Sequence, residues 1–174
     1  MSDSFFREKV AVVTGAGGTL CSAVAVELAR RGARVALLGR TMGKLEPVAA
    51  TISGAGGTAL ALGVDVTDAA AVESACHGIT ERLGPCELLV NGAGGNRNDA
   101  VTTTTEFDPA EIEAARPEGM RGFFNLDPDR MLDVIGLNTI GTSIPCQVFG
   151  RVMARRGSGA IVNFASMKDR KSVV

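Results

Sequence analysis

The chain has 174 residues, of which 45% are hydrophobic and 21% are charged, and it contains 22 glycines but no tyrosine or tryptophan. This composition excludes disordered, collagen-like and coiled-coil proteins, and the length suits one domain with a substantial core. The net charge of −1 excludes the basic surface that nucleic acids or an anionic membrane require, so the expected partner is a small-molecule substrate.

Short apolar segments typical of buried parallel strands alternate with amphipathic segments typical of helices. Capping residues mark several of the helix ends, among them Thr41, Asp127 and Gly32. The predicted strands cover residues 9–14, 34–38, 58–64, 86–90 and 160–165, and the predicted helices cover residues 20–31, 41–52, 68–83 and 127–155. Pro145 removes one backbone donor from the last helix, so we expect a local distortion there.

This alternation predicts an α/β fold, a doubly wound, Rossmann-like parallel sheet joined by right-handed crossovers. We interpret residues 1–174 as a single domain of this Rossmann-like kind, with a long insertion at about 95–127 where no regular pattern holds. The chain stops just after the fifth predicted strand. Because a buried strand needs a covering layer, we expect the fold to be incomplete at its C-terminus.

The N-terminal ten residues lack the apolar core of a signal peptide, and no apolar run approaches the roughly 20 residues of a membrane span. The four cysteines are widely spaced and the only histidine is His77, which predicts neither a disulfide framework nor a metal site. We therefore expect a cytoplasmic protein without a membrane partner.

A glycine-rich turn lies between the first predicted strand and the first predicted helix, where a phosphate-bearing ligand belongs. Glycines let the backbone approach such a ligand, and the helix N-terminus presents free N–H groups to a pyrophosphate. The candidate contacts are Gly15, Gly17, Gly18, Thr19 and Leu20. The alternative is a glycine-rich turn that only connects the two elements.

The end of the second predicted strand should lie beside the adenosine ribose of a dinucleotide. An acidic residue here favours NAD, but residues 38–40 contain no carboxylate. Arg40 instead suits the additional phosphate of NADP, so we predict NADP or NAD as cofactor, with a preference for NADP. A solvated surface arginine is the alternative.

The motifs and their order along the chain resemble those of the short-chain dehydrogenase/reductase family over nearly the whole sequence. Thr14 and the following glycines resemble its cofactor turn, and residues 123–127 and 145–150 resemble its D-mannonate oxidoreductase (fructuronate reductase) branch. The other matched cofactor positions are the adenine-contacting pair Asp65 and Val66 and the signature Asn91, Gly92, Ala93 and Gly94. The resemblance implies NAD(P)-dependent reduction of the keto group of a sugar acid, or the reverse oxidation, by a homo-oligomer.

The resemblance has departures and also implies roles for individual residues. Thr19 and Cys21 stand where the common family turn has glycine, and Gly92 replaces the second signature asparagine. Ser166 matches the serine that binds the substrate oxygen, and Asn138 matches the asparagine that organises a water in the proton relay. Ser166 could instead satisfy a strand end.

Asn138 is also singled out by its place in the pattern, because it lies near the apolar stripe of the last predicted helix. Its amide is therefore predicted to face inward, where an unpaired polar group is costly. A structural asparagine that bonds to a neighbouring strand is the alternative. A sugar-acid carboxylate favours arginine, so Arg97 and Arg121 in the insertion are candidate substrate contacts, with solvated loop arginines as the alternative.

The family's catalytic tyrosine and lysine have no matched positions, since only eight residues follow Ser166 and none is a tyrosine. Two hypotheses result. The chain is either part of an oxidoreductase that is active when intact, or a non-catalytic dinucleotide-binding fragment or module. In both cases we expect the 174 residues alone to be inactive.

Overall fold

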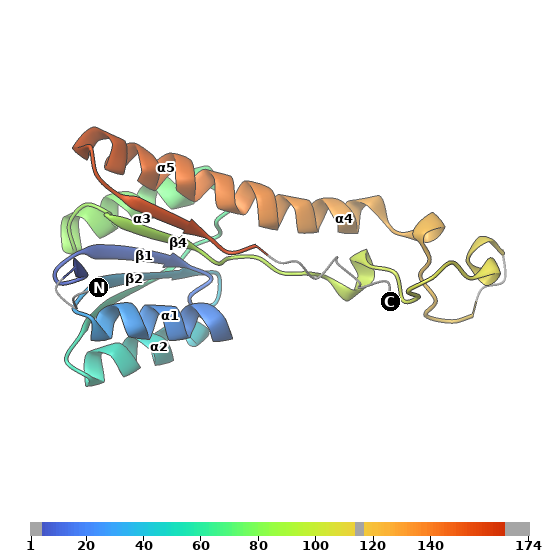
Figure 1. Ribbon diagram of the computed structural model, residues 1–174, viewed down its shortest axis with the longest axis horizontal. Helices are drawn as coiled ribbons and strands as arrows, with labels where there is room; N and C mark the ends of the chain where they lie inside the picture. The colour runs from blue at the N-terminus through green and yellow to red at the C-terminus, as the bar shows by residue number, and fades with distance from the viewer. Residues whose placement is uncertain (1–4, 114–116, 166–174) are drawn as a thin grey trace.

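A computed structural model describes residues 5–113 and 117–165 of the chain (Figure 1). Its core is a five-stranded parallel sheet with the strand order β3-β2-β1-β4-β5. The strands are β1 (Val10–Thr14), β2 (Arg34–Gly39), β3 (Thr58–Gly63), β4 (Leu88–Asn91) and β5 (Ala160–Asn163). The doubly wound, Rossmann-like prediction is confirmed, with each expected strand found within a few residues of its predicted bounds.

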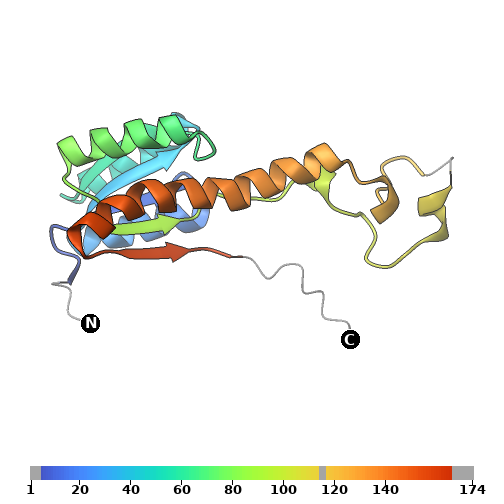
Figure 2. The ribbon, with the colours of Figure 1, turned by 90° about the horizontal axis from the view of Figure 1, so that it is seen from above.

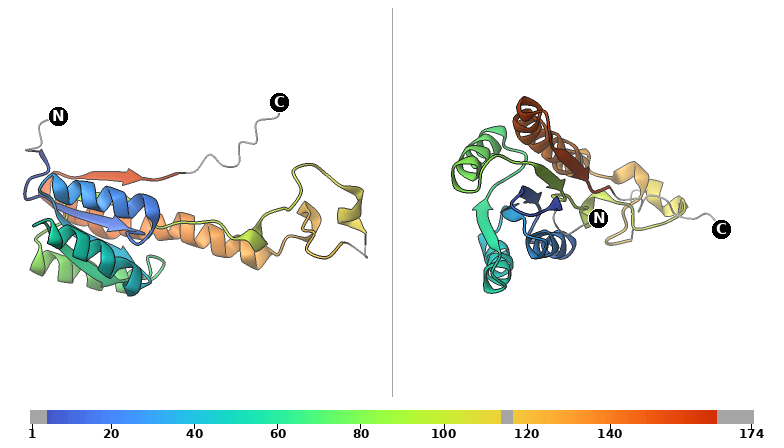
Figure 3. Two further views of the ribbon diagram at one scale, coloured as in Figure 1. Left: turned by 90° about the horizontal axis from the view of Figure 1, so that it is seen from below. Right: turned by 60° about the vertical axis from the view of Figure 1, so that its left-hand side comes forward.

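Helices cover both faces of the sheet, which explains why β1 is apolar at nearly every position (Figure 3). Ala11 and Val13 point to one face and pack with α1 (Thr19–Arg30) and α2 (Met42–Gly54). Val10 and Val12 point to the other face and share a core with α3 (Ala69–Arg82) and α5 (Gly141–Arg156). Every residue of β1 is buried.

Local signals define most of the helix ends. The Asp68 side chain accepts hydrogen bonds from the first turn of α3, and Gly32 follows α1 with a φ of +92°. Gly157 ends α5 in the left-handed conformation. Thr41 is the N-cap residue of α2, but its side chain makes no capping bond within the described residues, so the expected side-chain cap is wrong in that detail.

The predicted helix over residues 127–155 is divided into α4 (Pro128–Ile135), a π-helical segment (Gly136–Ile140) and α5. Asp127 caps α4 as predicted, with its carboxylate accepting a bond from the amide of Asp129. The π segment ends one turn before Pro145, which agrees with the expected local distortion. A Cβ on Gly141 would lie 2.8 Å from a Val66 methyl, so α5 begins in close contact with the turn after β3.

The described part of the insertion contains three short 3-10 helices, Asn98–Ala100, Pro109–Ile112 and Phe123–Asn125, and it projects with α4 beyond the sheet (Figure 2). Glu111 is 3% exposed and organises the insertion. Its carboxylate accepts hydrogen bonds from Thr104 Oγ1 at 2.8 Å, Phe123 N at 3.0 Å and Asp108 N at 3.3 Å. The Thr104 bond, followed by the two amide bonds, lowers the pKa of this carboxyl.

β5 pairs with β4 and is exposed along its whole length. Ile161 and Val162 are 41% and 53% exposed, so among the described residues this strand lacks a full covering layer, which agrees with the expectation of a fold that is incomplete at its C-terminus. Within the part of the chain that the structure describes, no helix is both long enough and apolar enough to cross a membrane.

Replacing Glu111 with alanine should loosen the insertion while leaving the sheet intact, because one carboxylate holds three donors from separated segments. We expect hydrogen exchange of the insertion amides to accelerate roughly tenfold or more, with the strand amides unchanged. The exposed Glu113→Ala is the matched control. Equal protection in both variants would contradict this role for Glu111.

Protonation of Glu111 should have the same local effect. The folded-state pKa lies below the unfolded value, so the stabilisation is complete above the unfolded pKa and is lost as the pH falls through the folded value. Hydrogen exchange at several acidic pH values, corrected for the intrinsic rates, should show this loss in the wild type and not in Glu111→Ala.

Candidate nucleotide-binding site

The carboxyl ends of the strands meet around a cavity of about 270 Å³ at the edge where the sheet order reverses between β1 and β4. In open α/β sheets a ligand crevice forms at this point, because the connections diverge to opposite faces. The lining residues are Gly15, Gly17, Gly18, Gly39, Arg40, Thr41, Lys44, Leu45, Val64, Asp65, Val66, Gly92, Ala93, Gly94 and Leu137. The structure thus brings nine of the twelve predicted cofactor contacts together, the exceptions being Thr19, Leu20 and Asn91.

The glycines of the first turn allow close contact with neighbouring elements. Gly15 has a φ of +66°, and a Cβ there would lie 2.6 Å from the carbonyl oxygen of Gly92. A Cβ on Gly17 would lie 2.8 Å from the Cβ of Lys44. Any larger residue at these two positions would push apart the walls of the cavity.

The N-terminus of α1 follows this turn. Gly18 is the N-cap residue and has no side chain, so within the described residues no side chain caps the first amides of α1. These amides and the helix dipole suit a pyrophosphate. Thr19 and Leu20 occupy the first helical positions but do not line the cavity, and the Leu20 side chain is 58% exposed. Their role as cofactor contacts stays a prediction.

Two cations and one carboxylate line the opposite wall of the cavity. Arg40 follows β2, and Lys44 lies in the first turn of α2. Asp65 accepts hydrogen bonds from Thr67 N at 2.9 Å and Thr67 Oγ1 at 2.7 Å; these bonds, with a smaller contribution from the Arg40 charge, lower its pKa. Sequence reasoning missed Lys44, although its position four residues after Arg40, at the start of a predicted helix, was available as a signal.

The turn after β4 forms the third wall. Asn91 is 2% exposed and does not line the cavity; its Nδ2 donates to Asn163 Oδ1 at 2.9 Å and to Cys146 Sγ at 3.1 Å. This side chain therefore ties β4 to β5 and α5. The backbone amides of Gly92 and Ala93 both donate to the hydroxyl oxygen of Thr14, each at 3.1 Å.

Asn138 lies in the π-helical segment and bonds to the chain just after β4. Its Oδ1 accepts from Gly95 N and its Nδ2 donates to Gly95 O, both at 2.9 Å. The residue is exposed, so the expected inward orientation is wrong, because the π segment interrupts the regular helical spacing. This contact is close to the alternative of a structural asparagine that bonds to a neighbouring strand. The adjacent residue Leu137 lines the cavity instead.

The remaining predicted residues lie elsewhere. Ser166 is outside the described residues. Arg97 does not line the cavity but lines an adjoining groove of about 640 Å³, which shares Arg40, Asp65, Gly94 and Leu137 with it. Arg121 lies in the insertion, where its Nε donates to a backbone carbonyl at 3.4 Å, and it lines neither space.

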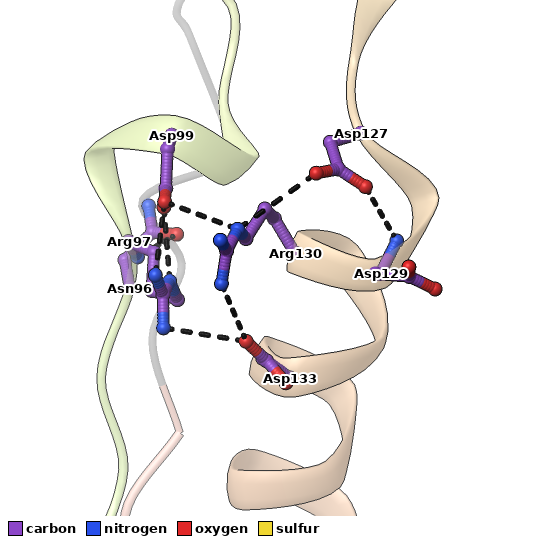
Figure 4. A network of polar contacts seen from close by, with 7 residues as sticks. All are labelled: Asn96, Arg97, Asp99, Asp127, Asp129, Arg130 and Asp133. Atoms are coloured by element: carbon purple, nitrogen blue, oxygen red, sulfur yellow. Dashed lines mark hydrogen bonds and ion pairs between the residues drawn. The ribbon is translucent and has the colours of Figure 1, made fainter.

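Arg97 belongs to an ion-pair network between the insertion and α4 (Figure 4). Its guanidinium bonds to Asp99 at 2.9 Å and to Asp133 at 3.3 Å. Arg130 reaches Asp99, Asp127 and Asp133 at 3.6 to 3.7 Å. The hydrogen bonds from Arg97 lower the pKa of Asp99 to about 2.

A family comparison matches residues 9–174 to the short chain dehydrogenase family. The chain belongs to this family. It is 43% identical over 159 residues to UxuB, an uncharacterised oxidoreductase of Bacillus subtilis (strain 168), and the match covers 91% of this chain and 55% of UxuB. An uncharacterised oxidoreductase of Haemophilus influenzae is 36% identical over 161 residues, with 92% of this chain and 55% of that protein covered.

Solved structures show the same relationship for this short chain dehydrogenase. A Haemophilus influenzae protein named as a D-mannonate oxidoreductase, with bound NAD, superposes with a TM-score of 0.83 at 35% identity, over 92% of this chain and 56% of that one. A metagenomic short-chain oxidoreductase in complex with NADP superposes with a TM-score of 0.78 at 26% identity. The match covers 99% of this chain and 68% of that one. The chain spans about half the length of the curated relatives it matches.

The Thr14 hydroxyl gives a direct test of how the cavity is assembled. Thr14→Val keeps the shape of the side chain but leaves the amides of Gly92 and Ala93 without their acceptor. We expect the free energy of unfolding to fall by about 1–3 kcal/mol in urea titrations. Thr51→Val, which removes an exposed hydroxyl bonded to Pro47 O, is the control and should have little effect. Equal losses in the two variants would refute this role.

Proposed function

We propose that this short chain dehydrogenase provides the NAD(P)-binding part of an oxidoreductase that reduces the keto group of a sugar acid resembling fructuronate, or oxidises the corresponding mannonate-like alcohol. One observation carries the nucleotide-binding part of the proposal. A cavity at the switch point of the sheet joins a glycine turn, an uncapped helix N-terminus and two cations, Arg40 and Lys44.

The chemistry of the lining residues fits a dinucleotide. The first amides of α1 suit the pyrophosphate, and Asp65 and Val66 line the cavity where the resemblance expects adenine. Arg40 and Lys44 supply positive charge beside the end of β2, and residues 38–40 contain no carboxylate that could accept from the ribose hydroxyls of NAD, which favours NADP. A bound nicotinamide supplies or accepts the hydride in such a reaction.

The sugar-acid substrate is proposed from relatives and from the residues of the insertion. A protein named as a D-mannonate oxidoreductase is among the similar structures, and residues 123–127 and 145–150 of this chain resemble motifs of that branch. A substrate carboxylate would have to compete with Asp99 and Asp133 for Arg97, whereas Arg121 pairs with no carboxylate among the described residues. Arg121 is therefore the more available of the two proposed contacts.

A second candidate function is dinucleotide binding without turnover. It is favoured by the absence of any tyrosine among the 174 residues, since reduction of a ketone needs an acid that protonates the developing alkoxide. Asn138 and Ser166 keep their proposed supporting roles only where such an acid is present. We also propose the cytoplasm as the location, because the spacing of the cysteines predicts no disulfide framework, and a homo-oligomer as the assembly, from the family resemblance.

Cofactor titration tests nucleotide binding and preference. We expect the wild-type chain to enhance NADPH fluorescence with a dissociation constant lower than that for NADH. Arg40→Ala should raise the NADPH constant roughly tenfold and leave the NADH constant nearly unchanged, because it removes a charge-assisted contact to the additional phosphate. Arg82→Ala, at the far end of α3, is the control. Equal affinity of the wild type for both nucleotides would refute the NADP preference.

A turnover assay tests the prediction that the chain is inactive by itself. We expect the purified chain to bind NADPH and to oxidise none of it above background when fructuronate is added, because it supplies no acid at the matched position. Sustained, protein-dependent NADPH oxidation would refute the non-catalytic alternative and show that another group serves as the acid.

A further inference from the structure

Two backbone turns touch along one wall of the cavity. Thr14 and Asn91 are paired in the parallel register of β1 and β4, so the residues that follow them leave the sheet side by side. The Thr14 hydroxyl binds the amides of Gly92 and Ala93, and Gly15 approaches the carbonyl of Gly92 more closely than any side chain would allow. The positions of these two turns are therefore coupled.

Cys21 packs behind this contact. It lies in the first turn of α1, is 4% exposed and does not line the cavity. A Cβ added to Gly92 would overlap the Cys21 sulfur, whereas Thr14 O and Phe164 Cδ2 would be 3.3 and 3.4 Å away. Of the nearest neighbours, the sulfur is thus the atom that excludes a side chain at Gly92.

Cys21 and Gly92 are also two of the positions at which the chain departs from the family pattern. Cys21 stands in place of a glycine of the cofactor turn, and Gly92 stands in place of an asparagine. The first change adds a sulfur atom at the contact and the second removes a side chain from the same space. The two departures are sterically complementary.

We propose that Cys21 and Gly92 form a matched steric pair that sets the separation of the β1 and β4 turns and thereby the width of the cofactor cavity. Gly15 and Gly92 both line the cavity, so a displacement of either turn changes its shape. Cys21 acts through Gly92 as a positioning residue. The inference rests on the proposed nucleotide-binding function.

Gly92→Ala is the direct test, because the close-packed sulfur leaves no room for the added methyl. We expect the dissociation constant for NADPH, measured by fluorescence titration, to rise roughly tenfold or more. Adding Cys21→Ala removes the sulfur but keeps a good helix residue. The double variant C21A/G92A should return to within about threefold of the wild type.

A matched control separates cavity shape from general loss of stability. A Cβ on Gly57 would meet Ile52 Cγ2 at 2.9 Å, at a position that does not line the cavity. Gly57→Ala should lower the urea midpoint and leave NADPH affinity within about twofold of the wild type. If Gly57→Ala weakened binding as much as Gly92→Ala, the effect would be one of stability and the proposal would be wrong.

The remaining outcomes also support or refute the steric pair. Wild-type affinity in Gly92→Ala would refute the pair, as would a double variant no better than the single one. If Gly92→Ala does not fold, recovery of folding and binding in C21A/G92A supports the pair, and failure to recover refutes it. A wild type that binds neither nucleotide refutes the proposed function, and the urea midpoints of the same variants then decide the steric pair alone.

Discussion

The hydrogen bonds from two backbone amides to the Thr14 hydroxyl are the contact on which the candidate site depends. Thr14 is fully buried, and the chain leaves β1 toward one face of the sheet and β4 toward the other. Parallel strands with diverging connections leave a crevice at this edge. The hydroxyl joins the two sides of that crevice. The glycines beside it, Gly15 and Gly92, let the backbones of the two turns come into direct contact.

The segment from α4 to α5 completes the cavity through an irregular turn rather than a regular helix. In the π-helical segment Leu137 reaches the cavity, while the adjacent Asn138 holds both backbone polar groups of Gly95. At its end, Gly141 packs against Val66, which lines the cavity from the turn after β3. A regular helix would present its residues at a constant spacing, so the extra residue of the π turn changes which side chain faces the cavity.

Two polar systems of different strength hold the insertion. Glu111 is buried and its bonds come largely from within the insertion, so it organises the segment internally. The network of Arg97, Asp99, Arg130 and Asp133 is half exposed and joins the insertion to α4. Exposed ion pairs contribute little and are screened by salt, so the internal carboxylate is the stronger restraint.

The sheet, its helices and the place of the glycine turn could all be predicted from residue order, because burial on both faces gives continuous apolar strands and amphipathic helices give a helical spacing of apolar residues. The sequence also identified nine residues of the cavity wall. Gly15, Gly17, Gly18 and Arg40 were found from their place after parallel strands, whose turns meet at one edge, and the other five from the family resemblance. Other features became visible only in three dimensions: Asn91 and Asn138 bind protein groups, Lys44 and Leu137 line the cavity, and Cys21 packs against Gly92. These features depend on distances between segments far apart in the chain and on one irregular helical turn. Neither produces a periodic pattern of residues from which it could be predicted.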